Sequence, residues 1–264
     1  DTITEGMRIR TARTVAAPTY MGGAFNGTTH YFTKTSPTST LSTVTNNFSI
    51  KATIEPTAYA AGYIAGRADA AGNNALGLFM EPTGQITVIV RNAAAANFRY
   101  ITSNQSVSLG KKTKIWTTWA SGTVVIMFDG VSVPVTAAGT GGTAPTTAGT
   151  GGDFSVGRYG ARNESYFTGY ISDVGVFNAV LTEATMRSYD SQALTGAETN
   201  CIGAWSLNNT GVNQQAPGTN DLTATGGVTY SNRSPYGNNG VSTTLDYGIV
   251  MAKSFSTNTT LTVQ

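Results

Sequence analysis

Apolar and polar residues alternate with a period of two along much of the chain, the pattern of half-buried β-strands. The clearest run is 48–56, in which Phe48, Ile50, Ala52 and Ile54 share one face. Other β-prone runs, separated by short turns rich in Gly, Asn, Asp and Pro, cover 63–67, 76–80, 85–91, 98–102, 113–120 and 124–133. Successive strands joined by short turns predict an all-β protein built from hairpins.

The stretch 154–177 predicts a strand, a polar loop at 159–165 and a longer second strand. Side chains alternate faces along a strand, so we expect Ile171 and Asp173 on one face of the second strand and Val174 on the other. Apolar residues occur on both faces, which indicates that this strand is central.

A short helix is expected near 182–190. Thr182 is placed to accept hydrogen bonds from the free amides of the first turn, and Glu183 lies at the positive end of the helix dipole. Leu181 and Met186 have the spacing of a hydrophobic staple at the helix entry.

These motifs, in this order, resemble laminin G-like (concanavalin A-like) jelly-roll domains. The motifs are the strand at 48–56, the Asp129-Gly130 turn after the strand at 124, and F-T-G-Y-I-S-D-V-G-V-F-N at 167–178, followed by A-V-L-T-E. The resemblance implies an all-β fold, a two-sheet antiparallel jelly-roll sandwich with one short helix. Laminin G-like domains often bind calcium through loop oxygens at the rim of the sandwich.

The expected organisation has three parts: an N-terminal arm or edge strand at 1–20, the jelly-roll domain at 21–236, and a β-prone extension at 237–264. The segment 201–207 resembles a strand that precedes the first strand in many family members, but here it follows the helix. It either completes the sandwich from the other end of the chain or begins a second module.

Charged residues make up 11% of the chain, compared with roughly 25% in a typical soluble domain. The 16 basic and 14 acidic residues are dispersed and give a formal net charge of +2. No basic stripe is present, which argues against nucleic-acid binding, and no apolar run approaches the ~20 residues of a membrane-spanning helix. The low charge favours a secreted protein or a virion protein.

The single cysteine, Cys201, excludes an internal disulfide. We expect it to be a small buried residue, because it lies in an apolar strand. Trp116, Trp119 and Trp205 are expected in the core for the same reason, since their neighbours alternate as strands do.

A sandwich hydrolase would require two carboxylates about 5–10 Å apart. No strand offers two acids alternating on one face: Glu55 and Glu81 each precede a proline, Asp129 lies in a turn and Asp173 stands alone. We therefore expect no catalytic residues, although acids distant in sequence could still converge.

Glycan binding requires an aromatic platform beside planar hydrogen-bonding groups, held on loops. The loop at 159–166 combines both within a few residues, and an arginine of an earlier strand adds to the set. The candidate glycan-binding residues are Tyr159, Arg162, Asn163, Glu164, Tyr166 and Arg67. The alternative is that the two tyrosines only flank a hairpin loop.

The loop at 68–74 is a candidate calcium site, because Ca²⁺ takes about six to eight oxygen ligands. Its candidate ligands are Asp69, Asn73 and Asn74. The loop holds a single carboxylate, so the alternative is that these residues only form turns. No cofactor is required by the sequence, and Ca²⁺ is the one candidate.

The first functional hypothesis is a non-enzymatic structural or adhesion protein of a phage or virus particle, of the head-decoration or tail-fibre type. It predicts a location on the virion surface or outside the cell. It also predicts an oligomer, with contacts to other virion proteins or to itself through the terminal extensions, and a jelly roll that touches cell-surface glycans. The alternative is a secreted bacterial carbohydrate-binding module, with or without calcium, and a polysaccharide hydrolase is the third hypothesis.

Overall fold

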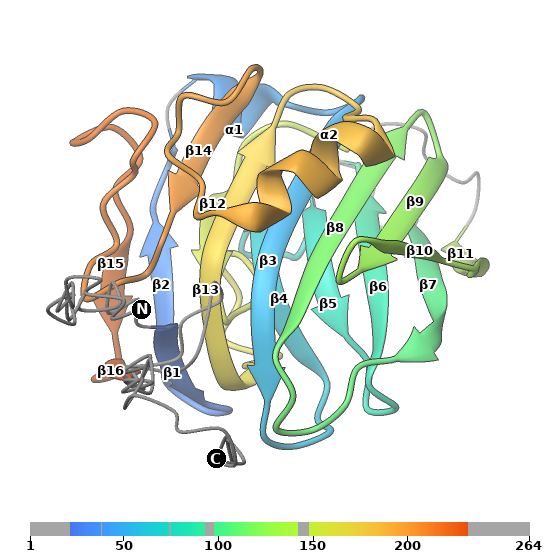
Figure 1. The fold of residues 1–264 in the computed structure, drawn as a ribbon. Helices are drawn as coiled ribbons and strands as arrows, with labels where there is room; N and C mark the ends of the chain where they lie inside the picture. Colours follow the sequence, from blue (N-terminus) through green and yellow to red (C-terminus); the bar gives the residue numbers. More distant parts are fainter. Residues whose placement is uncertain (1–21, 38, 74, 93–97, 142–147, 232–264) are drawn as a thin grey trace, which may run out of the picture.

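The computed structural model describes residues 22–37, 39–73, 75–92, 98–141 and 148–231, with backbone only at 39, 98–100 and 138–141. Two eight-stranded antiparallel sheets pack face to face (Figure 1), which confirms the predicted jelly-roll sandwich. The proposed arm at 1–20 and extension at 237–264 lie outside the described residues. Within the described part, no helix combines the length and apolar character needed to cross a lipid bilayer.

The first sheet, here called sheet A, carries most of the predicted signature strands. In spatial order its strands are β10 (Val131–Val133), β9 (Thr123–Phe128), β8 (Thr113–Ala120), β3 (Phe48–Pro56), β13 (Thr168–Phe177), β1 (Gly22–Asn26) and β16 (Thr229–Ser231). The strand β14 (Cys201–Trp205) pairs with the C-terminal half of β13, while β1 pairs with its N-terminal half. β13 is therefore central, as predicted.

The second sheet, here called sheet B, is built mainly from the run of hairpins in the first half of the chain. Its strands in spatial order are β11 (Val135–Gly141), β7 (Phe98–Ser106), β6 (Gln85–Arg91), β5 (Leu76–Met80), β4 (Gly62–Ala68), β12 (Asp153–Val156), β2 (Tyr31–Lys34) and β15 (Thr223–Thr225). The first residues of the low-complexity run that begins at 137 continue β11, which pairs with β7.

The predicted helix is present as α2 (Glu183–Ser188), followed by the 3₁₀ turn η1 (Tyr189–Ser191). Thr182 caps it, because its hydroxyl accepts a hydrogen bond of 3.2 Å from the amide of Thr185. α2 lies across the outer face of sheet A (Figure 1). A second short helix, α1 (Ser39–Thr43), lies in a Ser/Thr-rich segment.

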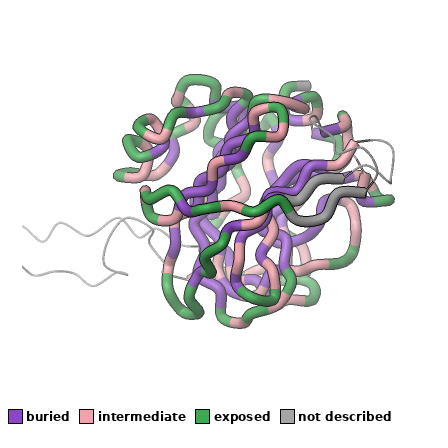
Figure 2. Tube along the Cα trace, turned by 90° about the vertical axis from the view of Figure 1, so that its right-hand side faces the viewer, coloured by how far each residue is buried: buried purple, intermediate pink, exposed green. Residues whose placement is uncertain are grey.

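The main core lies between the two sheets, where Figure 2 shows the buried strands and the exposed loops around them. Phe48, Ile50, Ala52 and Ile54 are at most 1% exposed and all belong to this core. The three tryptophans are fully buried, as predicted. Two of them lie between the sheets, and Trp116 lies in a second cluster under α2.

A β-bulge in β13 overturns the expected facing of its side chains. The pairing of β13 with β3 shifts register between Ser172 and Gly175, and Asp173 has φ +50°. The extra residue shifts the alternation of side chains by one position, so Ile171 and Val174 both point into the core between the sheets. The expectation that they face opposite sides was wrong.

The C-terminal strands join both sheets of this sandwich. β14 extends sheet A beside β13, β15 pairs with β2, and β16 pairs with β1. Cys201 in β14 is 8% exposed, and burial raises the pKa of its thiol to about 12. A thiol held protonated in this way is a packing residue, since the thiolate is the reactive form.

Candidate functional site

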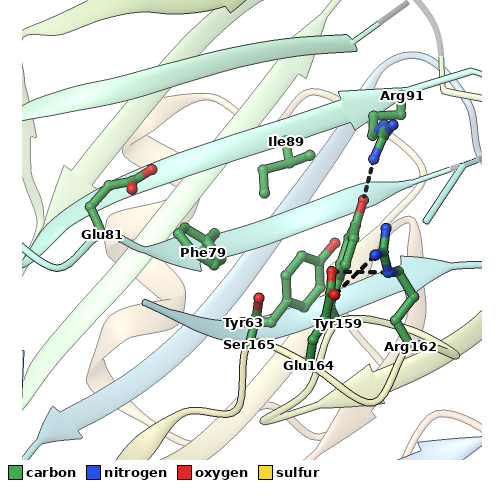
Figure 3. Close-up of a pocket in the computed structure, with 9 residues that line it drawn as sticks. All are labelled: Tyr63, Phe79, Glu81, Ile89, Arg91, Tyr159, Arg162, Glu164 and Ser165. Atoms are coloured by element: carbon green, nitrogen blue, oxygen red, sulfur yellow. Dashed lines mark hydrogen bonds and ion pairs between the residues drawn. The ribbon is translucent and has the colours of Figure 1, made fainter. Parts of the chain in front are cut away.

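The outer face of sheet B carries a hollow of about 310 Å³. Three adjacent strands, β4, β5 and β6, form its floor, and the loop between β12 and β13 forms one wall (Figure 3). The residues that line it are Tyr63, Phe79, Glu81, Ile89, Arg91, Tyr159, Arg162, Glu164 and Ser165. Three of the predicted glycan-binding residues, Tyr159, Arg162 and Glu164, are brought together here.

The floor of the hollow is apolar. Tyr63 is fully buried and its hydroxyl donates a hydrogen bond of 3.1 Å to the carbonyl oxygen of Leu76. Its ring fits there because Gly77 has no Cβ, which would overlap the tyrosine hydroxyl. The ring of Tyr159, 7% exposed, packs with its centroid 4.7 Å from that of Tyr63. Phe79, which is only partly buried, is the aromatic ring that this floor presents to solvent.

The loop that forms the wall is fixed by specific contacts. The Tyr159 hydroxyl donates a hydrogen bond of 2.7 Å to the carbonyl of Gly72. Gly72, at φ +76°, also leaves the space that the side chain of Arg162 fills. The guanidinium carbon of Arg162 lies 5.9 Å from the centroid of the Tyr159 ring. The wall is therefore organised before any ligand arrives.

Arg162 and Glu164 form a bidentate ion pair on this wall. Arg162 Nε lies 2.9 Å from one carboxylate oxygen of Glu164, and Nη2 donates to the other at 2.9 Å. The two side chains remain 33% and 45% exposed. An exposed pair of this kind contributes little to stability, but it fixes two planar hydrogen-bonding groups at the edge of the hollow.

Arg91 and Glu81 complete the polar edge. Arg91 Nη1 lies 3.5 Å from the Tyr159 hydroxyl, and Glu81 accepts a hydrogen bond of 2.7 Å from the hydroxyl of Thr87. Figure 3 shows both side chains beside the apolar floor, at its two ends. The hollow thus combines one accessible aromatic ring with two guanidinium and two carboxylate groups.

A family model described as the concanavalin A-like lectin/glucanases superfamily matches residues 26–186. The chain belongs to this superfamily. Its description covers both lectins and glucanases, so membership establishes the fold and leaves binding and catalysis both open.

Two solved structures illustrate the likeness to other concanavalin A-like domains. One, from Bacteroides ovatus, is assigned provisionally to carbohydrate binding; it has 17% identity and a TM-score of 0.54 over 80% of this chain and 59% of its own. The other is a heptameric SAP-like pentraxin from Limulus polyphemus, with 16% identity and a TM-score of 0.50 over 80% of this chain and 94% of its own. The chain thus spans about three fifths of the Bacteroides protein. A search among curated protein sequences finds no match.

Two other predicted residues lie outside the hollow. Asn163 accepts a hydrogen bond of 2.8 Å from Arg158, whose guanidinium lies 3.8 Å from the centroid of the Tyr31 ring. Tyr166 also packs against Tyr31, with the ring centroids 6.1 Å apart. The predicted cluster is therefore divided between two groups of side chains.

Arg67 does not fit its predicted role in glycan binding. It is fully buried, and its guanidinium donates hydrogen bonds to the carbonyl oxygens of Leu41 at 2.9 Å and Gly149 at 2.5 Å. Its cross-strand partner Phe154 lies in the core, so Arg67 points inward from β4. Burial lowers its pKa to about 10. Arg67 ties α1 and the segment near 149 to sheet B.

The candidate calcium loop uses its carboxylate internally. Asp69 Oδ1 accepts hydrogen bonds from the amides of Ala71 at 2.9 Å and Asn73 at 2.8 Å, as expected for a turn-forming Asx residue. Asn74 lies outside the described residues. Across the described ranges, no group of three or more His, Cys, Asp or Glu side chains is placed to hold a metal ion. Calcium binding stays a prediction.

Phe79, Glu81 and Arg91 are three of the six lining residues that sequence reasoning missed. These three residues come from β5, from the turn that follows it and from β6. The sequence shows the alternation of these strands, but it does not show which strands pair and so bring these residues to the loop at 159–165. One signal could have been used: Ile89 and Arg91 are two positions apart, so both side chains lie on the same face of β6, which is the outer face.

Proposed function

We propose that this domain is a non-enzymatic glycan-binding module and that the hollow on sheet B holds the sugar. The observation that carries the proposal is the partly exposed ring of Phe79 in the same hollow as Arg91, Arg162 and Glu164. The C–H face of a sugar packs on an aromatic ring, while planar charged groups bind its hydroxyls. A small number of polar groups placed around an apolar floor is typical of small-molecule binding sites.

The volume and rigidity of the hollow suit a small ligand. About 310 Å³ lies at the lower end of the range of ligand pockets, which favours one or two sugar units over a long chain. The Arg162–Glu164 pair and the bond from Tyr159 to Gly72 hold the wall in place. A preorganised wall lowers the entropy lost on binding.

A glycan array, followed by calorimetry on the best glycan found, tests this proposal. Phe79→Ala and Arg162→Ala are each expected to weaken binding at least about tenfold, since both remove a direct contact. Asn163→Ala is the matched control, because the Asn163 side chain lies in the same loop but outside the hollow. The affinity of this variant for the glycan should equal that of the wild type. A blank array, or equal affinity in all variants, would contradict glycan binding at this site. Repeating the array with a chelator tests the predicted dependence on calcium.

We also propose a more specific setting, a structural or adhesion protein of a phage or virus particle that acts on the virion surface. The low fraction of charged residues, 11%, supports it, together with the β-prone sequences at both ends of the chain. This setting predicts self-association. Light scattering should detect an oligomer of the full chain that is lost when residues 1–20 and 237–264 are deleted, whereas a monomer unchanged by the deletions would argue against it.

The alternative setting is a secreted bacterial carbohydrate-binding module. The likeness of the fold to the Bacteroides ovatus protein is the observation that favours it. This setting shares the glycan site and needs no oligomer, so a monomer that binds glycans would support it. Release of reducing sugar from a polysaccharide, lost in Glu81→Gln or Glu164→Gln, would instead point to the hydrolase.

A further inference from the structure

A lysine and an aspartate meet in the buried layer between sheet A and α2, on the opposite side of the sandwich from the hollow. Lys51 Nζ on β3 lies 2.5 Å from Asp173 Oδ2 on β13, and the two side chains are 0% and 2% exposed. Removing two charges from water is unfavourable unless they are closely paired. The glycan-binding proposal makes no use of this pair.

The β-bulge brings the two side chains together. Lys51 pairs with Gly175 across the strands, and the register shift between Ser172 and Gly175 leaves Asp173 as the extra residue. At φ +50° this aspartate directs its side chain to the outer face, where Lys51 also points. The contact thus depends on a backbone conformation that is uncommon outside glycine.

Aromatic rings close off the site from water. Lys51 Nζ lies 5.4 Å from the centroid of the Trp116 ring. The rings of Phe177 and Tyr189 pack with Trp116, at centroid distances of 5.6 Å and 6.3 Å. In this cage the amine and the carboxyl group have each other as reaction partners, at a high effective concentration.

We propose that Lys51 and Asp173 condense to form an intramolecular isopeptide bond. One ammonium proton first moves to Asp173 Oδ2, which gives a neutral amine and a carboxylic acid. The lone pair of Nζ then attacks Cγ and forms the C–N bond. The C–Oδ2 bond breaks, and Oδ2 leaves as water after it takes a second proton from the nitrogen. The products are one amide and one water, with no change of oxidation state.

The surrounding backbone assists this condensation. The amide of Leu194 donates a hydrogen bond of 3.0 Å to Asp173 Oδ1, the oxygen on which negative charge develops during the attack. The carbonyl of Tyr189 accepts a hydrogen bond of 3.1 Å from Lys51 Nζ and so orients the nitrogen. The bond would link the centres of β3 and β13 in a chain whose single cysteine cannot form an internal disulfide.

Mass spectrometry of the purified, folded full chain tests the proposal. The intact mass is expected to be about 18 Da, one water, below the mass calculated from the sequence. Tandem spectra of a tryptic digest should show the peptide that contains Lys51 joined to the peptide that contains Asp173. A full calculated mass, with the two peptides recovered separately, would overturn the proposal.

Two variants distinguish the isopeptide bond from other reactions that release one water. A cyclic imide at Asp129-Gly130 would remove the same mass, but that loss would persist in Lys51→Met, whereas the isopeptide predicts the full calculated mass of this variant. Asp173→Asn should lose about 17 Da instead, because ammonia is the leaving group. A loss of 18 Da that persists in Lys51→Met contradicts the proposal. The wild-type tandem spectrum decides the matter even where a variant fails to fold.

Discussion

Replacement of Trp205 by alanine is expected to lower the free energy of unfolding by about 3–5 kcal/mol, the range for removing a buried large aromatic side chain. The indole is fully buried, and its ring stacks on Phe154 with the centroids 4.8 Å apart. Its Nε1 donates a hydrogen bond of 3.1 Å to the carbonyl of Asn220. Alanine would leave a cavity between the sheets and a buried carbonyl without its donor. Urea denaturation followed by far-UV circular dichroism measures the loss.

Two further variants make this experiment specific. Trp205→Phe keeps most of the ring volume and is expected to lose much less stability than Trp205→Ala. Val212→Ala changes a side chain that is 38% exposed in the same C-terminal region, and its effect should stay within about 0.5 kcal/mol. If Trp205→Ala behaved like Val212→Ala, the strands from 201 onward would not share the cooperative unit of the sandwich, and the second-module alternative would gain support.

The predictable parts of the fold are those with unbroken register. Phe48, Ile50 and Ile54 occupy alternate positions in a strand that pairs continuously with β8. Every second residue of this strand therefore points into the core, as the sequence pattern predicts. β13 breaks this rule at Asp173, where one extra residue reverses the facing of every residue after it. Nothing in the local pattern marks the bulge, because Val174 and Val176 suit either face.

The candidate site was predictable only where it is local. Tyr159, Arg162 and Glu164 lie in one loop, and the combination of their residue types within a few positions is enough to mark the loop as a candidate site. Phe79 and Arg91 join them through strand pairing, which composition and periodicity do not encode. Arg67 was assigned to the wrong environment, because one register shift in β4, between Tyr63 and Ala65, turns it toward the core beside Phe154.

Asp173→Ala is expected to lower the free energy of unfolding by at least about 3–5 kcal/mol, the range for breaking a buried pair by removing one partner, and loss of the proposed covalent bond would add to it. Lys51 would remain in an aromatic cage without its anion, and the amide of Leu194 would lose its acceptor. The same urea titration measures the loss. The control is Glu183→Ala, which breaks the exposed pair with Arg187 on α2 and should change stability by less than about 1 kcal/mol.

The double variant Lys51→Met/Asp173→Leu distinguishes an ion pair from the proposed covalent bond. Replacing a buried ion pair with apolar residues of similar size is often neutral or stabilising, while leucine at φ +50° costs about 1–2 kcal/mol of backbone strain. An ionic wild type therefore predicts a double variant that is at most about 2 kcal/mol less stable than the wild type. An isopeptide bond closes a loop of about 120 residues in the unfolded chain, and its loss would leave the double variant about 5 kcal/mol less stable. The bond also keeps the unfolded wild type compact, so the wild type should show a smaller dependence of unfolding free energy on urea than the double variant. Equal slopes with a stability loss of no more than about 2 kcal/mol in the double variant would contradict the bond and leave Lys51 and Asp173 as an ion pair that holds the bulge of β13.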